Sequence, residues 1–75
     1  MIFPGNPTID FLSMDVEGSE YPILRTIPFD KVDIRMIMIE VNHSPKQKIH
    51  NYMINNGYTL LKELPIDMVY KKKIA

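Results

Sequence analysis

The chain has 75 residues, 45% of them hydrophobic, and its nine basic and nine acidic residues give a formal net charge of zero. This composition is typical of a small globular domain and argues against intrinsic disorder, and the balanced charge argues against a nucleic-acid-binding domain. The absence of cysteine excludes disulfides and thiolate metal sites. No apolar run approaches the roughly 20 residues of a membrane span, and residues 1–7 do not resemble a signal peptide, so the sequence indicates no compartment.

The first part of the chain predicts a strand followed by a short helix. Residues 1–7 contain two prolines and a glycine and are predicted to form an irregular lead-in. Ile9–Val16 has apolar residues at odd and even positions, which predicts a strand buried on both faces, as in a parallel sheet. The helix that follows is predicted to begin after Ser19 as its N-cap and to end before Pro28.

The middle of the chain repeats this arrangement with stronger signals. The centre of Ile34–Val41 is a continuous apolar run, which predicts a central strand covered on both faces. A helix is then predicted to begin with Ser44 as its cap, Pro45 in its first position and Gln47 completing a capping box. Gly57 is predicted to terminate this helix in the left-handed conformation.

The last part of the chain predicts a hairpin. Tyr58–Leu64 and Asp67–Lys72 are both strand-like and are separated by a two-residue break, which predicts antiparallel neighbours. The expected order is therefore β-α-β-α-β-β, an α/β fold whose first two strands are parallel and whose last strand is antiparallel. We expect a single partial domain over residues 1–75, with a tail at residues 73–75, and we interpret Lys71–Lys73 as solvated rather than phosphate-binding.

Several other side chains are interpreted as structural. The methionines are expected to fill the core. The four tyrosines, at positions 21, 52, 58 and 70, are expected to be partly buried because they are amphipathic. His50 lies in the middle of the second predicted helix among polar neighbours and is expected at the surface.

Acidic and polar side chains follow both predicted parallel strands. Asp15 and Glu17 come at the end of the first strand, and Glu40, Asn42 and His43 at the end of the second. Ligands in open α/β sheets bind at the carboxyl ends of the strands, so we expect these residues to share one rim. A carboxylate there can accept a proton from a substrate nucleophile. His43 could assist as a base, although a histidine just before a capped helix is typical of a solvated loop.

Two other interpretations of the acidic residues stay open. Glu17 and Glu20 could simply complement the dipole of a helix N-terminus. Asp15, Glu40 and Asn42 could supply oxygen ligands for magnesium. A third carboxylate with suitable geometry is not evident, so no metal ligands are predicted.

The residues Ile9–Glu20, IDFLSMDVEGSE, resemble the signature of FkbM-type methyltransferases, in which a strand of the form (I/V)DFLK(I/L)DVEG(A/S)E leads into a helix. Ser13 replaces the usual lysine, and Ser19 takes the small position. The resemblance extends more weakly from about Thr8 to Lys72. Residues 27–34 are also similar to Star-like animal members of the group, some of which have no known methyl transfer activity.

This resemblance implies that the chain is the C-terminal half of a Rossmann-like class I methyltransferase sheet, contributing strands four to seven. It implies a transferase that moves a methyl group from S-adenosylmethionine to an oxygen or nitrogen nucleophile of a small molecule or sugar. The implied catalytic residues are Asp15, Glu17 and Glu40, and Asp15 and Val16 are the implied cofactor-binding residues. The Star-like similarity implies the alternative of a non-catalytic protein-interaction module with the same fold.

Parts of a complete class I domain are missing from these residues. No Gly-x-Gly sequence occurs, and the acidic residue that holds the ribose hydroxyls is not evident. We therefore expect these residues alone to be inactive and to show no measurable binding of the methyl donor. We also expect the exposed edge of the first strand to be covered by further sheet or by pairing with a second chain.

Overall fold

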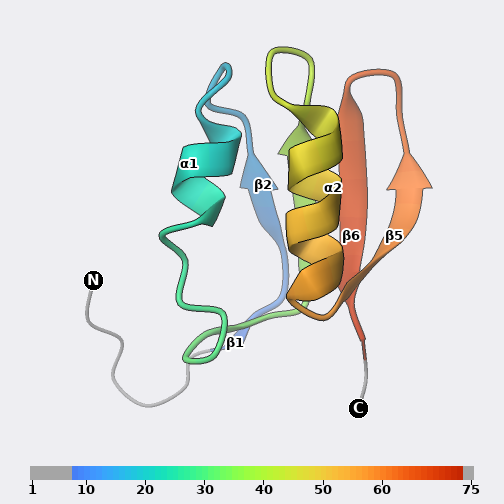
Figure 1. Ribbon diagram of the computed structural model, residues 1–75. Helices are drawn as coiled ribbons and strands as arrows, with labels where there is room; N and C mark the ends of the chain where they lie inside the picture. Colours follow the sequence, from blue (N-terminus) through green and yellow to red (C-terminus); the bar gives the residue numbers. More distant parts are fainter. Residues whose placement is uncertain (1–7, 74–75) are drawn as a thin grey trace.

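The computed structural model describes residues 8–73, which form a sheet with two helices packed against it (Figure 1). The predicted lead-in over residues 1–7 and the last two residues of the predicted tail lie outside the described residues. The elements in chain order are β1 (Thr8–Ile9), β2 (Leu12–Met14), α1 (Glu20–Leu24), β3 (Asp33–Ile34), β4 (Met36–Glu40), α2 (Lys46–Asn55), β5 (Tyr58–Glu63) and β6 (Asp67–Lys72).

The main sheet has the strand order β2-β4-β6-β5. β2 and β4 are parallel, with Met14 opposite Ile39, which confirms the predicted parallel pairing of the first two strands. β6 lies between β4 and β5 and is antiparallel to both, so the predicted final hairpin is also confirmed. The described residues therefore form a small α/β fold with a mixed sheet.

Both predicted parallel strands are interrupted rather than continuous. The first breaks between Ile9 and Leu12, and the second breaks at Arg35, so short strands β1 and β3 form a separate parallel pair. The two breaks lie side by side, because the Arg35 N–H donates to the Ile9 carbonyl at 2.8 Å. The two segments therefore stay joined by a backbone hydrogen bond at the point where both strands are interrupted.

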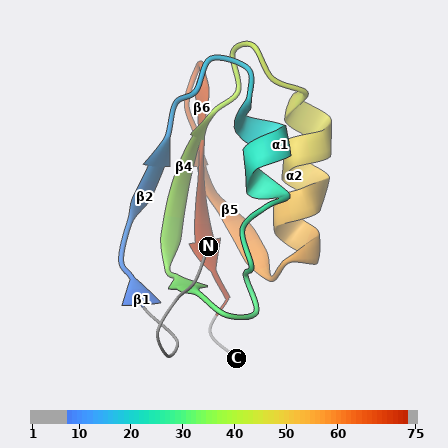
Figure 2. The same cartoon turned by 90° about the vertical axis from the view of Figure 1, so that its left-hand side faces the viewer.

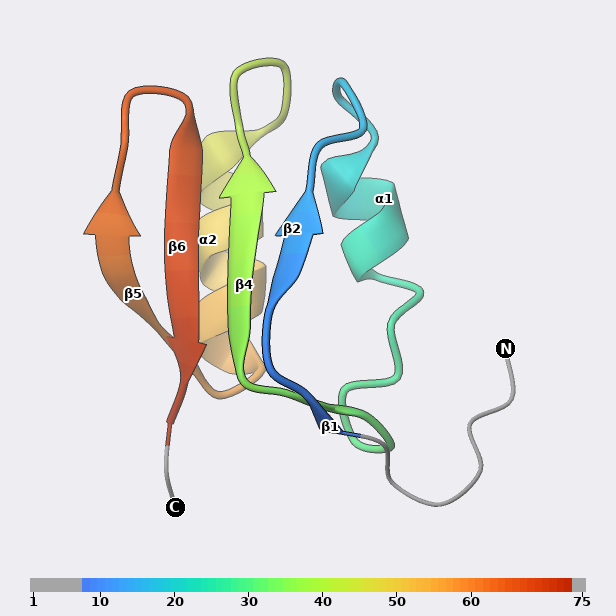
Figure 3. The same cartoon turned by 180° about the vertical axis from the view of Figure 1, so that it is seen from behind.

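Both helices lie on the same face of the sheet (Figure 2). On β4 the side chains of Ile37 and Ile39, on the helix side, are fully buried, whereas Met36 and Met38 on the other side are only half-buried. No helix from residues 8–73 covers that second face, which Figure 3 shows from the front. The prediction of strands buried on both faces is therefore wrong for this chain, because periodicity reports apolar side chains and not what covers them.

The core fills the space between the helices and the sheet. Leu24 of α1 and Ile49 and Met53 of α2 pack against the buried side of the strands. The remaining members are Met14, Val32, Ile34, Ile37, Ile39, Val41, Tyr58, Met68 and Tyr70. The expectation that methionines serve packing is confirmed for the three that belong to this core.

Two tyrosines are more deeply buried than predicted. Tyr58 and Tyr70 are at most 1% exposed, and the Tyr58 hydroxyl donates to the Ile34 carbonyl at 2.6 Å. The Tyr70 hydroxyl lies 2.9 Å from Nδ1 of His50, which is half-buried and not at the surface as predicted. Each hydroxyl can be buried because it has a hydrogen-bond partner. Burial raises the pKa of both phenols to about 12.

The start of α2 differs from the predicted capping box, whereas its end agrees with prediction. Pro45 is the N-cap, without a side-chain capping hydrogen bond. The Ser44 hydroxyl is bonded instead to the Glu20 carboxylate, and Gln47 bonds Asn51 one turn further along the helix. Gly57, just after the helix, has φ +88°, which confirms the predicted left-handed termination.

Candidate functional site

The structure brings two of the predicted catalytic carboxylates together at one edge of the sheet. Glu40 is the last residue of β4, and Asp15 directly follows β2. Because Met14 lies opposite Ile39 in this parallel pair, Asp15 and Glu40 are neighbours at the next position. Asp67, the first residue of β6, lies opposite Glu40 on its other side. Three adjacent strands thus each contribute a carboxylate to the same edge, and we call these three residues the acidic rim.

Glu40 is the residue whose acidity this arrangement changes most. Its hydrogen bond to Asp15, its desolvation and the negative charges of Asp15, Glu20 and Asp67 raise the pKa of Glu40 to about 7. Neighbouring carboxylates favour the proton-bearing form because two like charges in contact repel each other. A pKa of about 7 lets Glu40 exist in both protonation states near neutral pH, as a general acid or base must.

The turn between β2 and α1 contains the third predicted catalytic residue. Glu17 is exposed and has φ +49°, a left-handed conformation that is unusual for a residue other than glycine. Gly18 follows with φ +100°. A strained backbone held by its surroundings often occurs at functional sites. Glu17 projects from this turn, next to the strand end that carries Asp15.

Glu20 lies in the first turn of α1, as the dipole interpretation requires, but it has a further role that the sequence did not indicate. Its side chain is 1% exposed, and its carboxylate accepts hydrogen bonds from the Val16 N–H at 2.7 Å, the Gly18 N–H at 2.9 Å and the Ser44 hydroxyl. Burial alone would raise its pKa, but the bonds from Ser44 and the backbone outweigh burial, and the pKa of Glu20 lies below its usual value. Glu20 does more than complement a helix dipole, because it joins the turn after β2 to the loop after β4.

The remaining predicted site residues have more limited roles. The Val16 N–H is bonded to Glu20 and its carbonyl accepts from the Ser19 N–H at 3.2 Å, so its side chain, 38% exposed, is the part free to meet a ligand. Asn42 and His43 are exposed and contact each other, with Nδ2 of Asn42 3.3 Å from Nε2 of His43. Over residues 8–73 no group of three or more histidine or acidic side chains is arranged to hold a metal ion.

Comparison with known proteins places the sequence in a family. The family model described as the methyltransferase FkbM domain matches residues 2–60, well over half of the chain. The chain belongs to the FkbM methyltransferase family. The matched span of this FkbM domain contains Asp15, Glu17, Glu20 and Glu40, whereas Asp67 lies beyond it. Neither a curated protein nor a solved structure gives a significant match.

No helix within residues 8–73 of this FkbM domain is both long and apolar enough to span a membrane.

Substituting Gly18 tests how tightly two loops of the FkbM domain are packed: the turn after β2 (residues 15–19) and the loop after β4 (residues 41–45), which we call the rim loops. A Cβ at Gly18 would lie 3.2 Å from the His43 carbonyl oxygen, and φ there is +100°. We expect Gly18→Ala to lower the free energy of unfolding by about 2 kcal/mol, from backbone strain and displacement of the His43 loop. Gly57→Ala, with φ +88° but open space around the new Cβ, is the matched control and should cost about 1 kcal/mol. Urea denaturation measures both, and equal costs would show that the rim loops are not in close contact.

Glu40 gives the FkbM domain a pH dependence of defined sign. Its pKa is about 7 in the folded chain against 4.5 for an unperturbed glutamate, so the folded state binds the extra proton between these values. Its contribution to stability is therefore fully present below about pH 4.5 and is lost as the pH rises through about 7. In thermal denaturation, Glu40→Gln should become progressively more stable than the parent chain across this window. Asp30→Asn, at an exposed acid outside the rim, should show no such trend, and a constant Glu40→Gln difference would contradict the coupling to Asp15.

Proposed function

We propose that these residues form the part of an S-adenosylmethionine-dependent methyltransferase domain that holds the methyl acceptor. The domain would methylate an oxygen or nitrogen nucleophile of a small molecule or sugar. The observation that carries this proposal is the Asp15–Glu40 carboxylate pair at the ends of two neighbouring parallel strands. This is the edge of an open α/β sheet at which ligands bind. The FkbM family membership supports methyl transfer as the type of reaction.

Four residues at this end of the sheet have distinct roles in this proposal. S-adenosylmethionine, when bound, supplies an electrophilic methyl group on a positively charged sulfur. Asp15 would attract the positively charged end of the cofactor, and the exposed side chain of Val16 would contact its apolar part. Glu40, with a pKa near 7, would accept the proton of the acceptor hydroxyl or amine. Glu17, on the strained turn beside Asp15, would orient the acceptor.

The sheet order also supports this proposal. A class I methyltransferase sheet has seven strands with the last inserted antiparallel. Here the last strand, β6, is inserted between β4 and β5 and is antiparallel to both. We therefore assign β2, β4, β5 and β6 to strands four, five, six and seven of that sheet. In this assignment further strands of the domain would pair with the edge of β2 that faces away from β4.

The described residues fit part of the cofactor but not all of it. The negative charges of the acidic rim suit the positively charged sulfur of the methyl donor. The cradle that lets backbone approach the nucleoside needs a glycine-rich loop, and residues 8–73 contain glycine only at positions 18 and 57. We therefore propose that this chain binds S-adenosylmethionine only when joined to a segment that supplies such a loop.

A titration and a hybrid protein test this assignment. Calorimetric titration of the 75-residue chain with S-adenosylmethionine should show no saturable binding. A hybrid that joins the N-terminal half of another FkbM domain to this chain should bind the donor and transfer its methyl group. In that hybrid, Glu40→Gln should lower kcat/KM by about 100-fold, the usual size of a general acid–base contribution. Asp15→Asn should also lower kcat/KM, because it removes the negative charge that would attract the cofactor.

The control is Asp30→Asn, which removes an exposed carboxylate outside the rim and should leave kcat/KM unchanged. Tight binding of the donor by the chain alone would contradict the proposed division of the site. Full activity of a folded Asp15→Asn hybrid would show that the rim does not serve the reaction.

A further inference from the structure

A second polar site lies at the opposite end of the sheet from the acidic rim. A cavity of about 360 Å³ is lined there by four cationic side chains, Arg35, Lys71, Lys72 and Lys73, and by the carboxylates of Asp10 and Asp33. Arg35 precedes β4 and Glu40 ends it, so a rise of ~3.3 Å per residue separates the two sites by roughly 16 Å. We call this cavity the basic pocket.

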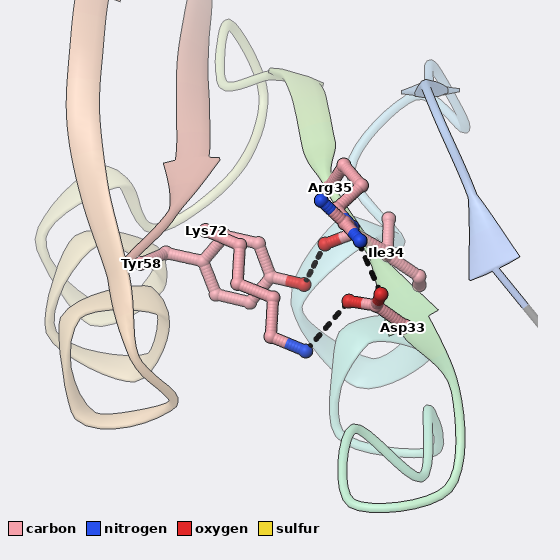
Figure 4. A network of polar contacts seen from close by, with 5 residues as sticks. All are labelled: Asp33, Ile34, Arg35, Tyr58 and Lys72. Carbon is pink, nitrogen blue, oxygen red and sulfur yellow. Dashed lines mark hydrogen bonds and ion pairs between the residues drawn. The ribbon is translucent and has the colours of Figure 1, made fainter. Parts of the chain in front are cut away.

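Asp33 holds two of the cations in place. Its Oδ2 lies 2.8 Å from Nε of Arg35 and its Oδ1 lies 2.8 Å from Nζ of Lys72 (Figure 4). The hydrogen bonds from Lys72 and Arg35 lower the pKa of Asp33, so it stays ionised between them. Figure 4 also shows the Tyr58 hydroxyl bonded to the Ile34 carbonyl, which anchors the segment that carries Asp33 and Arg35 to the core.

The backbone of Lys71–Lys73 is part of the folded structure, and the side chains of Lys71 and Lys73 are exposed, as the solvated interpretation expected. Lys71 and Lys72 belong to β6, and the Lys72 N–H donates to the Arg35 carbonyl at 2.9 Å. The Lys73 N–H donates to the Gly57 carbonyl at 2.9 Å. The backbone that carries these side chains is therefore held in place before any ligand arrives, which reduces the entropy lost on binding.

The charge of the basic pocket is unbalanced although the whole chain has a net charge of zero. Asp33 compensates one of the two cations that it binds, and within residues 8–73 no ion pair joins Lys71 or Lys73 to a carboxylate. Four cations against two carboxylates leave an excess of two positive charges around the cavity. The apolar thioether side chain of Met36 adds an apolar wall, and ligand pockets of a few hundred Å³ commonly combine polar and apolar lining.

We propose that the basic pocket binds the phosphate group of a phosphate monoester. The excess of two positive charges matches the dianion, and the guanidinium of Arg35 offers donors that suit phosphate oxygens. Lys71 and Lys73 would supply the remaining charge. The volume of about 360 Å³ leaves room for the group that the phosphate esterifies. A sugar phosphate and a lipid phosphate headgroup share this chemistry.

The proposal is independent of methyl transfer, because no rim residue lines the basic pocket. It is tested on the full chain by following backbone amide NMR signals during titration with inorganic phosphate, glucose 6-phosphate and unphosphorylated glucose. We expect saturable shifts at Arg35 and Lys71–Lys73 with a phosphate-bearing probe, no shifts with glucose, and unchanged signals at the rim. Co-sedimentation with phosphatidylcholine vesicles, with and without phosphatidic acid, reports a lipid source.

The variant Lys71→Gln/Lys73→Gln should weaken phosphate binding at least tenfold. Both side chains are exposed, so the variant should keep its fold, which the NMR spectrum itself reports. Lys48→Gln/Lys62→Gln removes the same charge from exposed positions outside the pocket and should bind like the parent chain. The proposal is overturned if none of the phosphate-bearing probes binds, or if the two double variants lose affinity equally, since the effect would then reflect overall charge.

Discussion

Replacing Glu20 with alanine is expected to lower the free energy of unfolding by about 3 kcal/mol at neutral pH. The substitution removes a buried carboxylate and leaves the Val16 and Gly18 N–H groups and the Ser44 hydroxyl without this acceptor. Buried polar groups that lose their partner cost about 1–3 kcal/mol each, and relaxation of the turn recovers part of this loss. Urea denaturation measures the change.

The neighbouring Glu17→Ala is the matched control, because Glu17 is an exposed glutamate in the same turn. We expect it to change stability by less than about 0.5 kcal/mol. The pKa of Glu20 is lowered in the folded chain, so its contribution is present above the usual glutamate pKa of 4.5 and is lost as the pH falls through the folded value. Equal effects of the two substitutions at neutral pH would show that Glu20 does not link the rim loops.

Ile37→Ala is expected to cost about 3–4 kcal/mol. Ile37 is fully buried in β4 between its neighbours on β2 and β6, Leu12 and Tyr70, so truncation leaves a cavity in the middle of the core. A chain of 75 residues has a total stability of roughly 4–11 kcal/mol, so this single change removes a large share of it. The midpoint of thermal denaturation should fall accordingly.

Met38→Ala, one residue further along β4, tests the same strand on its uncovered face. Met38 is half-buried, and we expect its truncation to cost about 1 kcal/mol or less. The contrast with Ile37 measures how one-sided the burial of β4 is. If Met38→Ala were as costly as Ile37→Ala, this face would be covered in solution, and sedimentation analysis would show whether a second chain covers it.

The meeting of Asp15 and Glu40 could be predicted because it depends on local signals, whereas Asp67, which pairs with Glu40 from β6, was missed. Asp15 and Glu40 each follow an apolar strand, and parallel strands bring their carboxyl ends to one edge of a sheet. The raised pKa of Glu40 could not be predicted, because it depends on one specific register. A shift of one residue in the pairing of β2 with β4 would move Asp15 to the other face.

Glu20 and the lysine run show a different limit of local reasoning. The sequence position of Glu20, near a helix start, suggests only that it could complement the helix dipole. It is buried because Ser44, 24 positions away, supplies a hydrogen bond from a second loop. Lys72 is held by Asp33, 39 positions away, and Lys73 by Gly57. No pattern within a short window carries such information.

The sequence by itself determined the kind and order of the main elements, the left-handed Gly57 and the family. These features follow from periodicity, turn residues and a contiguous motif, all of which are local. The tertiary structure alone decided which face of β4 is covered, which carboxylates touch, and that basic residues from two distant segments surround one cavity. These features depend on strand register and on contacts between distant segments, because burial and electrostatic coupling arise only when those segments pack together.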